Sequence, residues 1–469
     1  MSDEHFDLVV IGAGPAGEKG AAQAAYFGKR VAIIEREPEP GGAAVHTGTL
    51  PSKTLRETAL YLSGYRARDL YGVAVELAPG ATLPHLMSRK NVIIDAESLE
   101  FRRNFERHGI VYVPGSGSFL DQNSVLVKSS SGERRITADR FLIATGSKPH
   151  RPADMDFNDP SIHDSDEVLT IQHLPQSLVI LGGGVIGCEY ACMFAALNAR
   201  VTLVDARDEI LPFLDLEIVA RLKQAMDKLG IQLIQSTRWT SARREGEQIV
   251  ATLSDGRRLQ SQDLLFAAGR TGNTSELGLD KVSVVPDARG YLTVDAEFRT
   301  TAPHIFAAGD VIGFPALASV SMEQGRVAVC HAFEFNYKRA VSKLMPYGIY
   351  TIPEVSAFGE TEETCKQKAI DYVVGRALFA NNPRGKITGD LDGLIKLVVD
   401  RKTRKLLGVH VVGERATELV HVGQCAIHLN GGIEVFIDMV FNYPTLADSY
   451  KYAAYECLKA LDSRAVSAN

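Results

Sequence analysis

The sequence predicts an α/β protein with two dinucleotide-binding domains followed by a C-terminal α+β domain. Three observations lead to this prediction. A glycine-rich turn between two apolar runs occurs twice, and the pattern of strands and helices changes after Pro346. The length of 469 residues leaves room for roughly three domains of about 150 residues. The residues are 45% hydrophobic and 23% charged, as in an ordinary globular protein.

The first glycine-rich turn follows the apolar run at residues 6–11. It has the pattern Gly-x-Gly-x-x-Gly, and its glycines are Gly12, Gly14 and Gly17. A helix is expected from this turn to about Gly28, and the next apolar run, 31–34, ends in Glu35. Glycines let a pyrophosphate approach the backbone at the helix N-terminus, and the acid can accept hydrogen bonds from a ribose. This stretch therefore predicts a Rossmann-like unit that binds a dinucleotide.

A second unit of the same kind starts at residue 178. Its glycines are Gly182, Gly184 and Gly187. The strand expected at 201–204 ends in Asp205, 23 positions after the first glycine of the turn, as in the first unit. Asp205 can accept hydrogen bonds from an adenosine ribose, which favours NAD(H), whereas Arg207 could pair with a 2′-phosphate, which favours NADP(H). Together they permit both nucleotides, unless Arg207 is an exposed arginine without a ligand role.

Between the two units, residues 41–53 read Gly-Gly-Ala-Ala-Val-His-Thr-Gly-Thr-Leu-Pro-Ser-Lys. We expect a loop over the bound cofactor and then a helix from Lys53 to Tyr65. This pattern resembles the active-site segment of the flavoprotein disulfide reductases, Gly-Gly-x-Cys-x-Asn-x-Gly-Cys-x-Pro-Ser-Lys. In that family the first dinucleotide fold holds FAD and the second holds NAD(P). The two redox-cysteine positions of the family are occupied here by Ala44 and Thr49.

The resemblance covers essentially the whole chain and implies its division into domains. It implies an FAD-binding domain in two parts, 1–150 and 273–345, an NAD(P)-binding domain at 151–272, and a C-terminal dimerisation domain at 346–469. The resemblance also implies further cofactor contacts, at Gly42, Thr145, Gly146, Gly269, Arg270, Gly309 and Asp310. Additional helices are expected at 93–108, 316–335, 417–429 and 433–440, and additional strands at 110–113, 124–128, 394–400 and 407–412.

The resemblance also implies catalytic residues. In the family a lysine and a glutamate that match Lys53 and Glu189 pair near flavin N5. His46 replaces the usual asparagine; it could contact the flavin or gate the nicotinamide, but a structural role is favoured. The family's C-terminal His-Pro-Thr-x-x-Glu is represented by Tyr443 to Asp448, and these two ends match residues that reach the partner's flavin. A homodimer is thus implied, and a larger homo-oligomer is compatible with it.

The absence of the family's two redox cysteines and of its C-terminal histidine indicates which chemistry remains. A tyrosine, with a pKa of about 10, is a poor general base near neutrality. Thiols and proton-handling base are therefore both absent, as expected of an enzyme that moves only hydride. Within the family the chain resembles the soluble (Si-specific) pyridine nucleotide transhydrogenases, which share Thr49, His46 and the string 442–445. They often retain the first cysteine, and Ala44 departs from that pattern.

The expected reaction is NADPH + NAD⁺ ⇌ NADP⁺ + NADH, ping-pong through FAD. The alternatives are an FAD-dependent NAD(P)H:quinone reductase or diaphorase, and a non-enzymatic flavoprotein. A net charge of −6 without a basic block argues against nucleic acid as a partner. No apolar stretch is long enough to span a membrane, and the acidic residues 1–4 do not resemble a signal peptide.

The cysteines point to a reducing, cytoplasmic location. All six are scattered and none forms a Cys-x-x-Cys pair, which fits reduced thiols better than disulfides. Cys188 and Cys192 share one face of a helix and are expected in the core. Further ligands are not evident near them, so no metal site is predicted.

Overall fold

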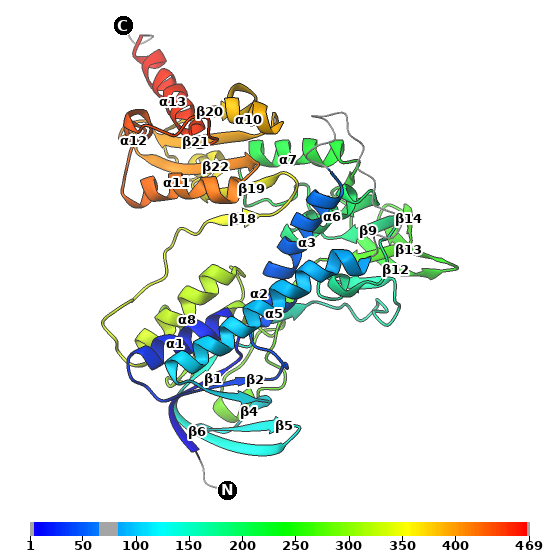
Figure 1. Ribbon diagram of the computed structural model, residues 1–469, viewed down its shortest axis with the longest axis vertical. Helices are drawn as coiled ribbons and strands as arrows, with labels where there is room; N and C mark the ends of the chain where they lie inside the picture. Colours follow the sequence, from blue (N-terminus) through cyan, green and yellow to red (C-terminus); the bar gives the residue numbers. More distant parts are fainter. Residues whose placement is uncertain (1–3, 65–82, 467–469) are drawn as a thin grey trace.

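The computed structural model describes residues 4–64 and 83–466, and within these residues the strands form five sheets. The molecule is elongated, with β1 near one end and the C-terminal helix α13 (Ser449–Val466) at the other (Figure 1). Two sheets with mainly parallel strands and a C-terminal antiparallel sheet follow one another along the chain, and two small antiparallel sheets complete the five. This order agrees with the predicted fold class, because each parallel sheet contains one of the two glycine-rich turns.

The first parallel sheet follows directly after the N-terminus. Its parallel strands are β3 (Val111–Pro114), β2 (Val31–Glu35), β1 (Glu4–Ile11), β6 (Gly132–Ile143) and β17 (Ile305–Ala307), in that order. The helices α1 (Pro15–Tyr26) and α8 (Ala318–Ala332) pack against each other and against this sheet. Apolar side chains of the sheet are buried on both faces, so the strands read as continuous apolar runs.

The first sheet also has an antiparallel extension, which was only partly predicted. The strands β4 (Ser116–Asp121) and β5 (Ser124–Ser129) form a hairpin that pairs with the N-terminal half of β6. The helix expected at 316–335 is shorter than predicted, and the helix expected to reach Gly28 ends at Tyr26.

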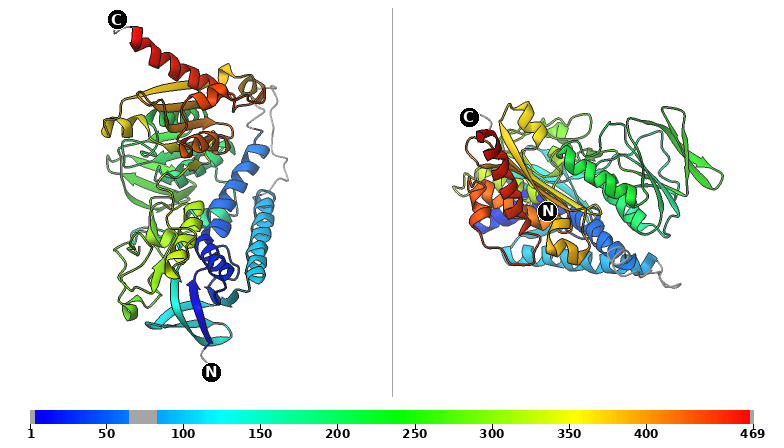
Figure 2. Two further views of the ribbon diagram at one scale, coloured as in Figure 1. Left: turned by 90° about the vertical axis from the view of Figure 1, so that its left-hand side faces the viewer. Right: turned by 90° about the horizontal axis from the view of Figure 1, so that it is seen from above.

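Two long helices, at residues 49–62 and 83–108, extend from the first domain toward the middle of the molecule. The stretch expected as a loop contains the short helix α2 (Gly42–His46). The next helix, α3 (Thr49–Leu62), begins four residues before the predicted Lys53, because Pro51 lies in its first turn, where proline is tolerated. The predicted end at Tyr65 lies outside the described residues. The antiparallel partner α5 (Leu83–His108) begins earlier than the predicted residue 93, and Figure 2 shows it running beside α3.

The second parallel sheet contains the second glycine-rich turn. Its strands are β11 (Gln232–Ile234), β10 (Arg200–Val204), β9 (Ser177–Leu181), β15 (Asp263–Phe266) and β8 (Ile162–Asp164), in that order. The buried helix α6 (Val185–Ala196) follows the turn. Cys188 and Cys192 lie on this helix and are buried in the core, as expected. The antiparallel sheet of β12 (Trp239–Glu245), β13 (Gln248–Leu253) and β14 (Arg258–Ser261) was not predicted. A two-stranded ribbon of β7 (Ser147–Pro149) and β16 (Arg270–Gly272) connects the two parallel-sheet domains.

The C-terminal domain is built on an antiparallel sheet. Its strands are β18 (Tyr347–Ile349), β19 (Glu354–Gly359), β22 (Leu406–Gly413), β21 (Leu394–Asp400) and β20 (Tyr372–Leu378), in that order. The helices α11 (Ala416–His428) and α13 pack on it, with the short helices α9 (Glu362–Gln367), α10 (Pro383–Thr388) and α12 (Glu434–Asp438) at its edges. This α+β layout agrees with the prediction, although only β21 and β22 were predicted as strands, and β18, β19 and β20 were not.

A buried lysine joins the second domain to the C-terminal domain. The Nζ atom of Lys396 on β21 lies 2.7 Å from Asp215 Oδ1, 3.0 Å from Glu217 Oε2 and 2.6 Å from Glu362 Oε1. Asp215 also caps the helix α7 (Leu216–Lys228) by accepting a hydrogen bond from the Glu217 N–H. Burial would lower the pKa of Lys396, but the hydrogen bonds that its ammonium donates to the carboxylates outweigh burial and raise it. The lysine therefore stays charged and holds α7 against the C-terminal sheet.

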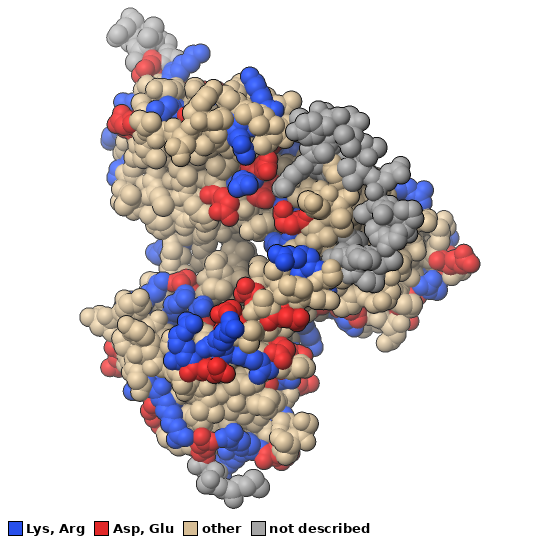
Figure 3. Space-filling model, viewed as in Figure 1, with Lys and Arg blue, Asp and Glu red and all other residues tan. Residues whose placement is uncertain are grey.

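Charged side chains of both signs are mixed on the face shown in Figure 3. Over α5, for example, Arg102 pairs with Glu39 and Arg103 pairs with Glu100. No helix in residues 4–64 and 83–466 has the length and apolar character needed to cross a membrane.

Candidate functional site: a cavity between two dinucleotide-binding turns

A cavity of about 1410 Å³ lies where the three domains meet. Figure 3 shows the surface hollowed between the part that contains α5 and the part that contains the C-terminal sheet. The cavity is lined by both glycine-rich turns, by α2 and the start of α3, and by the segment that begins β18. Sites of this kind occur at the carboxyl ends of parallel strands, where loops from several elements converge.

The first glycine-rich turn packs tightly. Gly12 has a φ of +105°, and a Cβ atom at Gly17 would overlap the Gly12 carbonyl oxygen, so neither position accepts a side chain. The turn presents the N-terminus of α1 to the cavity. Glu35 Oε2 accepts a hydrogen bond from the Ala13 N–H at 2.8 Å, and its other oxygen accepts one from the Glu37 N–H at 2.9 Å. The carboxylate predicted to bind a ribose therefore also fixes the loops on either side of it.

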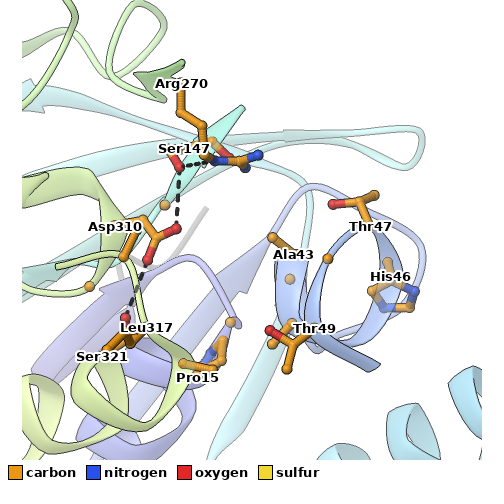
Figure 4. Close-up of a pocket in the computed structure, with 18 of the residues that line it drawn as sticks. Pro15, Ala43, His46, Thr47, Thr49, Ser147, Arg270, Asp310, Leu317 and Ser321 are labelled. Carbon is orange, nitrogen blue, oxygen red and sulfur yellow. Dashed lines mark hydrogen bonds between the residues drawn. The ribbon is translucent and has the colours of Figure 1, made fainter. Parts of the chain in front are cut away.

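The opposite wall of the first site carries Asp310. Its carboxylate accepts hydrogen bonds from Ser147 Oγ and Ser321 Oγ, each at 3.3 Å, and Ser147 Oγ accepts one from Arg270 Nε at 2.8 Å. Figure 4 shows this chain on one side of the cavity, with Thr49 on the other side. Burial raises the pKa of Asp310, although Arg270 and the two serines oppose the shift. These hydrogen bonds bring Ser147, which follows β6, and Asp310, which follows β17, to the same wall.

The remaining predicted contacts of the first site lie around this wall. Thr145 Oγ1 donates to the Asn273 carbonyl at 2.8 Å, and the Asn273 side chain donates to the Thr145 carbonyl at 3.0 Å. The Gly309 N–H donates to Gln324 Oε1 at 2.9 Å. The predicted positions that line the cavity here are Gly42, Thr145, Gly146, Gly269, Arg270, Gly309 and Asp310.

The segment in place of the family's disulfide also lines the cavity. Ala44 and Thr49 present a methyl group and a hydroxyl there. None of the six cysteines, all of which fall within the described residues, is part of the lining. The His46 ring donates a hydrogen bond from Nε2 to the Pro40 carbonyl at 2.9 Å, and Figure 4 shows it on the side of α2 away from Asp310. This contact fits the structural role that was favoured for His46.

Lys53 and Glu189 form an ion pair inside the cavity. Lys53 Nζ lies 2.6 Å from Glu189 Oε2, and the two side chains are 24% and 5% exposed. The lysine comes from the first turns of α3 and the glutamate from α6, so the pair bridges the first and second domains. A buried carboxylate requires such a partner, because an unpaired charge in this position would be costly.

The second glycine-rich turn places Asp205 beside the N-terminus of α6. Asp205 Oδ2 accepts a hydrogen bond from the Gly183 N–H at 2.5 Å and one from Arg207 Nη2 at 2.6 Å. Arg207 also donates to Oδ1 from its backbone N–H at 2.8 Å and from Nε at 2.9 Å. Burial would raise the pKa of Asp205, but its bonds to Arg207 and Gly183 hold it below the ordinary value. The two residues predicted to choose between nucleotides thus form one bidentate pair.

Seven predicted site residues are not part of the cavity lining: Gly17, Gly182, Gly187, Asp205, Arg207, Tyr443 and Asp448. The first five lie in or beside the two glycine-rich turns. Tyr443 and Asp448 belong to the segment before α13. The Tyr443 side chain is exposed, and the Asp448 N–H donates to Thr445 Oγ1 at 3.3 Å. They therefore do not meet Lys53 within one subunit.

Asp166 and Tyr350 are among the lining residues that sequence reasoning missed. Asp166 follows β8, and its Oδ1 atom lies 4.0 Å from Arg270 Nη1. Burial raises the pKa of Asp166 to about 6 against the attraction of Arg270. Tyr350 follows β18 and contacts both Lys53 and Glu189. Asp166 lies just after a strand of the second sheet, and this position could have marked it as a site residue. Nothing in the local sequence pattern marks Tyr350.

Two protein-family profiles together match most of the chain. The profile described as pyridine nucleotide-disulphide oxidoreductase matches residues 6–325. The profile described as the dimerisation domain of the same family matches residues 345–454.

Individual proteins extend this similarity. The chain is 42% identical over 458 residues to the soluble pyridine nucleotide transhydrogenase of Mycobacterium tuberculosis, covering 97% of this chain and 98% of the relative. It is 39% identical over 459 residues to that of Chromohalobacter salexigens, with 97% and 98% covered. Two solved structures are also similar. LpdA from Mycobacterium tuberculosis has a TM-score of 0.88 at 27% identity, covering 96% and 99% of the two chains. The flavoprotein disulfide reductase RclA from Escherichia coli has a TM-score of 0.87 at 26% identity, with the same coverage. The chain therefore belongs to the pyridine nucleotide-disulphide oxidoreductase family.

Proposed function

We propose that this protein is an FAD-dependent pyridine nucleotide transhydrogenase that catalyses NADPH + NAD⁺ ⇌ NADP⁺ + NADH. The observation that carries this proposal is the composition of the cavity. It contains both dinucleotide-binding turns and the Lys53–Glu189 pair, whereas Ala44 and Thr49 replace the thiols that a disulfide reductase needs. Relatives at about 40% identity bear this name, and their names give no support to the quinone reductase alternative.

The residues of the first site fit FAD, the cofactor that the family implies. Gly14 and Pro15, at the N-terminus of α1, line the cavity, so this helix end can receive a pyrophosphate. Glu35 and Asp310 supply carboxylates at the two places where the hydroxyls of a ribose and of a ribityl chain would need acceptors. When bound, FAD would supply an acceptor for hydride from one nicotinamide and a donor to the next.

The chain's own residues then have separate tasks in hydride exchange. The N-terminus of α6 binds the pyrophosphate of the nicotinamide nucleotide and directs its nicotinamide end along the helix toward Glu189. Glu189 holds the Lys53 ammonium in place. This fixed positive charge would stabilise the negative charge that develops on the group that accepts the hydride. Neither task requires a thiol or a proton donor, which is consistent with Tyr443 in place of the family's histidine.

The Asp205–Arg207 pair would let one site serve both nucleotides. With NAD(H), the Asp205 carboxylate can accept from the ribose diol once an Arg207 donor turns away, because Arg207 and the Gly183 N–H together fill its acceptor positions. With NADP(H), the Arg207 guanidinium can turn part of its five donors to the 2′-phosphate. A transhydrogenase needs this tolerance, whereas an enzyme for one nucleotide does not.

We further propose that the protein works as a cytoplasmic homodimer, which a larger assembly could contain. The matched dimerisation domain supports a dimer. Exposed apolar side chains also gather at the end of this domain, with Val440 94% and Leu429 82% exposed. A patch of this kind usually marks a protein contact. Tyr443 and Asp448, in the same region, would then reach the site of the partner subunit, and an active monomer would contradict this part of the proposal.

Steady-state kinetics provide a direct test. If NADPH and NAD⁺ use one nicotinamide site in turn, double-reciprocal plots at several fixed NADPH concentrations should be parallel, and each product should compete with the other substrate. Intersecting lines would mean that both nucleotides are bound together, and the proposed single site would be wrong.

A further inference from the structure

Tyr350 touches both members of the Lys53–Glu189 pair with two different parts. Its backbone N–H donates a hydrogen bond to Glu189 Oε1 at 2.9 Å. The face of its ring lies under the lysine, with Lys53 Nζ 5.0 Å from the ring centroid. Tyr350 belongs to the C-terminal domain and lines the cavity. A third domain therefore contributes to a pair that already joins the other two.

The backbone of this segment is held independently of the Tyr350 side chain. The Thr351 carbonyl, one residue later, accepts a hydrogen bond from Arg56 Nε at 2.9 Å, and Arg56 Nη1 lies 3.2 Å from Glu354 Oε1. Arg56 lies one turn after Lys53 on the same helix, so both side chains face the C-terminal domain. The segment is thus attached to α3 at two neighbouring points, and a change of the ring alone should leave the attachment at Arg56 intact.

The ring has a physical role that the carboxylate cannot fill. Glu189 Oε2 and Ser52 Oγ accept hydrogen bonds from the Lys53 ammonium, and the lysine side chain is still 24% exposed, so water can compete for its protons. An aromatic face attracts a cation and excludes water from that side. Burial raises the pKa of the Tyr350 hydroxyl, so the ring is neutral throughout the working range and does not compete with Glu189 as an anion.

We propose that Tyr350 is a positioning residue for hydride transfer, which fixes the Lys53 ammonium through its ring and the Glu189 carboxylate through its backbone. The proposal rests on the role of the Lys53–Glu189 pair in the proposed function. It assigns the ring, and not the hydroxyl, to the task. A phenylalanine should therefore replace Tyr350, and an aliphatic side chain of similar bulk should not.

The test uses the full-length holoenzyme and a single turnover with NADPH, followed by the loss of flavin absorbance in a stopped-flow instrument. Tyr350→Leu should slow this step about tenfold, the equivalent of roughly 1.4 kcal/mol, while Tyr350→Phe keeps close to the wild-type rate. The dissociation constant for NADP⁺ should be unchanged in both, because the adenosine and pyrophosphate contacts lie elsewhere. Tyr337→Leu removes an exposed tyrosine outside the cavity and serves as the control.

A second background separates positioning from a merely structural effect. In Lys53→Met there is no ammonium to hold, so adding Tyr350→Leu should slow the reaction no further. Additive losses, or a Tyr350→Leu enzyme that reacts at the wild-type rate, would overturn the proposal. Because the test uses only reduction by NADPH, a wild-type enzyme that fails to pass hydride on to NAD⁺ would refute the proposed function and leave this inference standing.

A spectroscopic measurement covers the case in which Tyr350→Leu does not fold. The resonance of ¹³C-methylated Lys53, assigned with Lys53→Arg, should show the upfield ring-current shift of a group over an aromatic face. The shift should be present in the wild-type holoenzyme and in Tyr350→Phe. Its absence from both proteins would show that the ring does not hold the ammonium.

Discussion

Lys53 Nζ and Glu189 Oε2 lie 2.6 Å apart, although the two residues are 136 positions apart in the sequence. The pair forms because α3 of the first domain and α6 of the second domain meet at the cavity, where α3 follows the short helix α2 and α6 follows the second glycine-rich turn. Its position at the junction means that hydride chemistry depends on how the two domains are held together. The geometry of this pair is therefore the main structural support for the proposed hydride transfer.

Removing the ammonium should impair catalysis more than folding. We expect Lys53→Met to lower the single-turnover rate of flavin reduction by about 10²-fold, because the fixed charge is lost from a partly buried site. Glu189→Gln should have a smaller effect, since it loosens Lys53 without removing it. The double variant Lys53→Met/Glu189→Leu removes the unpaired carboxylate, so it should recover thermal stability but not rate. Recovery of the rate would mean that the pair is structural only.

Arg207 should matter for one nucleotide more than for the other. Arg207→Ala is expected to raise the KM for NADP(H) about tenfold through the loss of a charge-assisted contact with the 2′-phosphate. The KM for NAD(H) should change little or fall, because Asp205 is then free for the ribose. Arg243→Ala, an exposed arginine of the same domain, is the matched control. Equal effects on both nucleotides would remove the proposed role.

The titration of Asp166 makes stability depend on pH. Its pKa is raised to about 6 in the folded protein from an ordinary 3.8. The stability that the neutral form contributes is complete below about pH 4 and is lost as the pH rises through about 6, since the buried group must then ionise. Asp166→Asn should therefore stabilise the protein on the order of 2 kcal/mol at pH 8 and clearly less at pH 5.

Thermal unfolding at the two pH values checks this prediction for Asp166. Asp154→Asn, at an exposed position shortly before β8, serves as the control and should shift the midpoint equally at both pH values. A stabilisation by Asp166→Asn that does not change with pH would contradict the titration.

The buried Lys396 should be among the most sensitive positions for stability. Lys396→Met leaves three carboxylates without their shared cation, and we expect a loss of about 3–5 kcal/mol. Lys228→Met removes a lysine that also bridges α7 to the C-terminal domain, but this pair with Asp392 is 61% exposed on both sides. It should cost about 1 kcal/mol or less. Chemical denaturation of the two holoenzymes compares them, and similar losses would show that burial does not set the cost.

Local patterns predicted the parts of the fold that depend on short stretches of sequence. The glycine-rich turns, with Glu35 and Asp205 at the ends of the next strands, mark both parallel sheets because turn, helix and acid are close in sequence. The helix α3 was predicted too late because Pro51 suggested a start, whereas it lies inside the first turn. The antiparallel strands β12 and β14 are partly exposed and carry charged residues, so they gave no clear apolar signal, whereas the mostly buried β13 between them is only six residues long.

Contacts between domains could be predicted only where the family resemblance supplied them. It paired Lys53 with Glu189, and the structure places them in contact. The ring of Tyr350 under Lys53 and the cluster around Lys396 join residues from distant elements, and no local pattern records such neighbours. Asp166 was missed for the same reason, because its raised pKa results from burial by a fold that the sequence describes only in outline.

The transfer of hydride from NADPH to NAD⁺ is the central claim, and one anaerobic stopped-flow experiment tests it most directly. The holoenzyme is first mixed with one equivalent of NADPH, and the flavin absorbance should disappear. It is then mixed with NAD⁺, and the absorbance should return at a rate at least equal to steady-state turnover, with NADH formed in equal amount. A flavin that stays bleached with NAD⁺ and recovers only when a quinone is added would contradict the account.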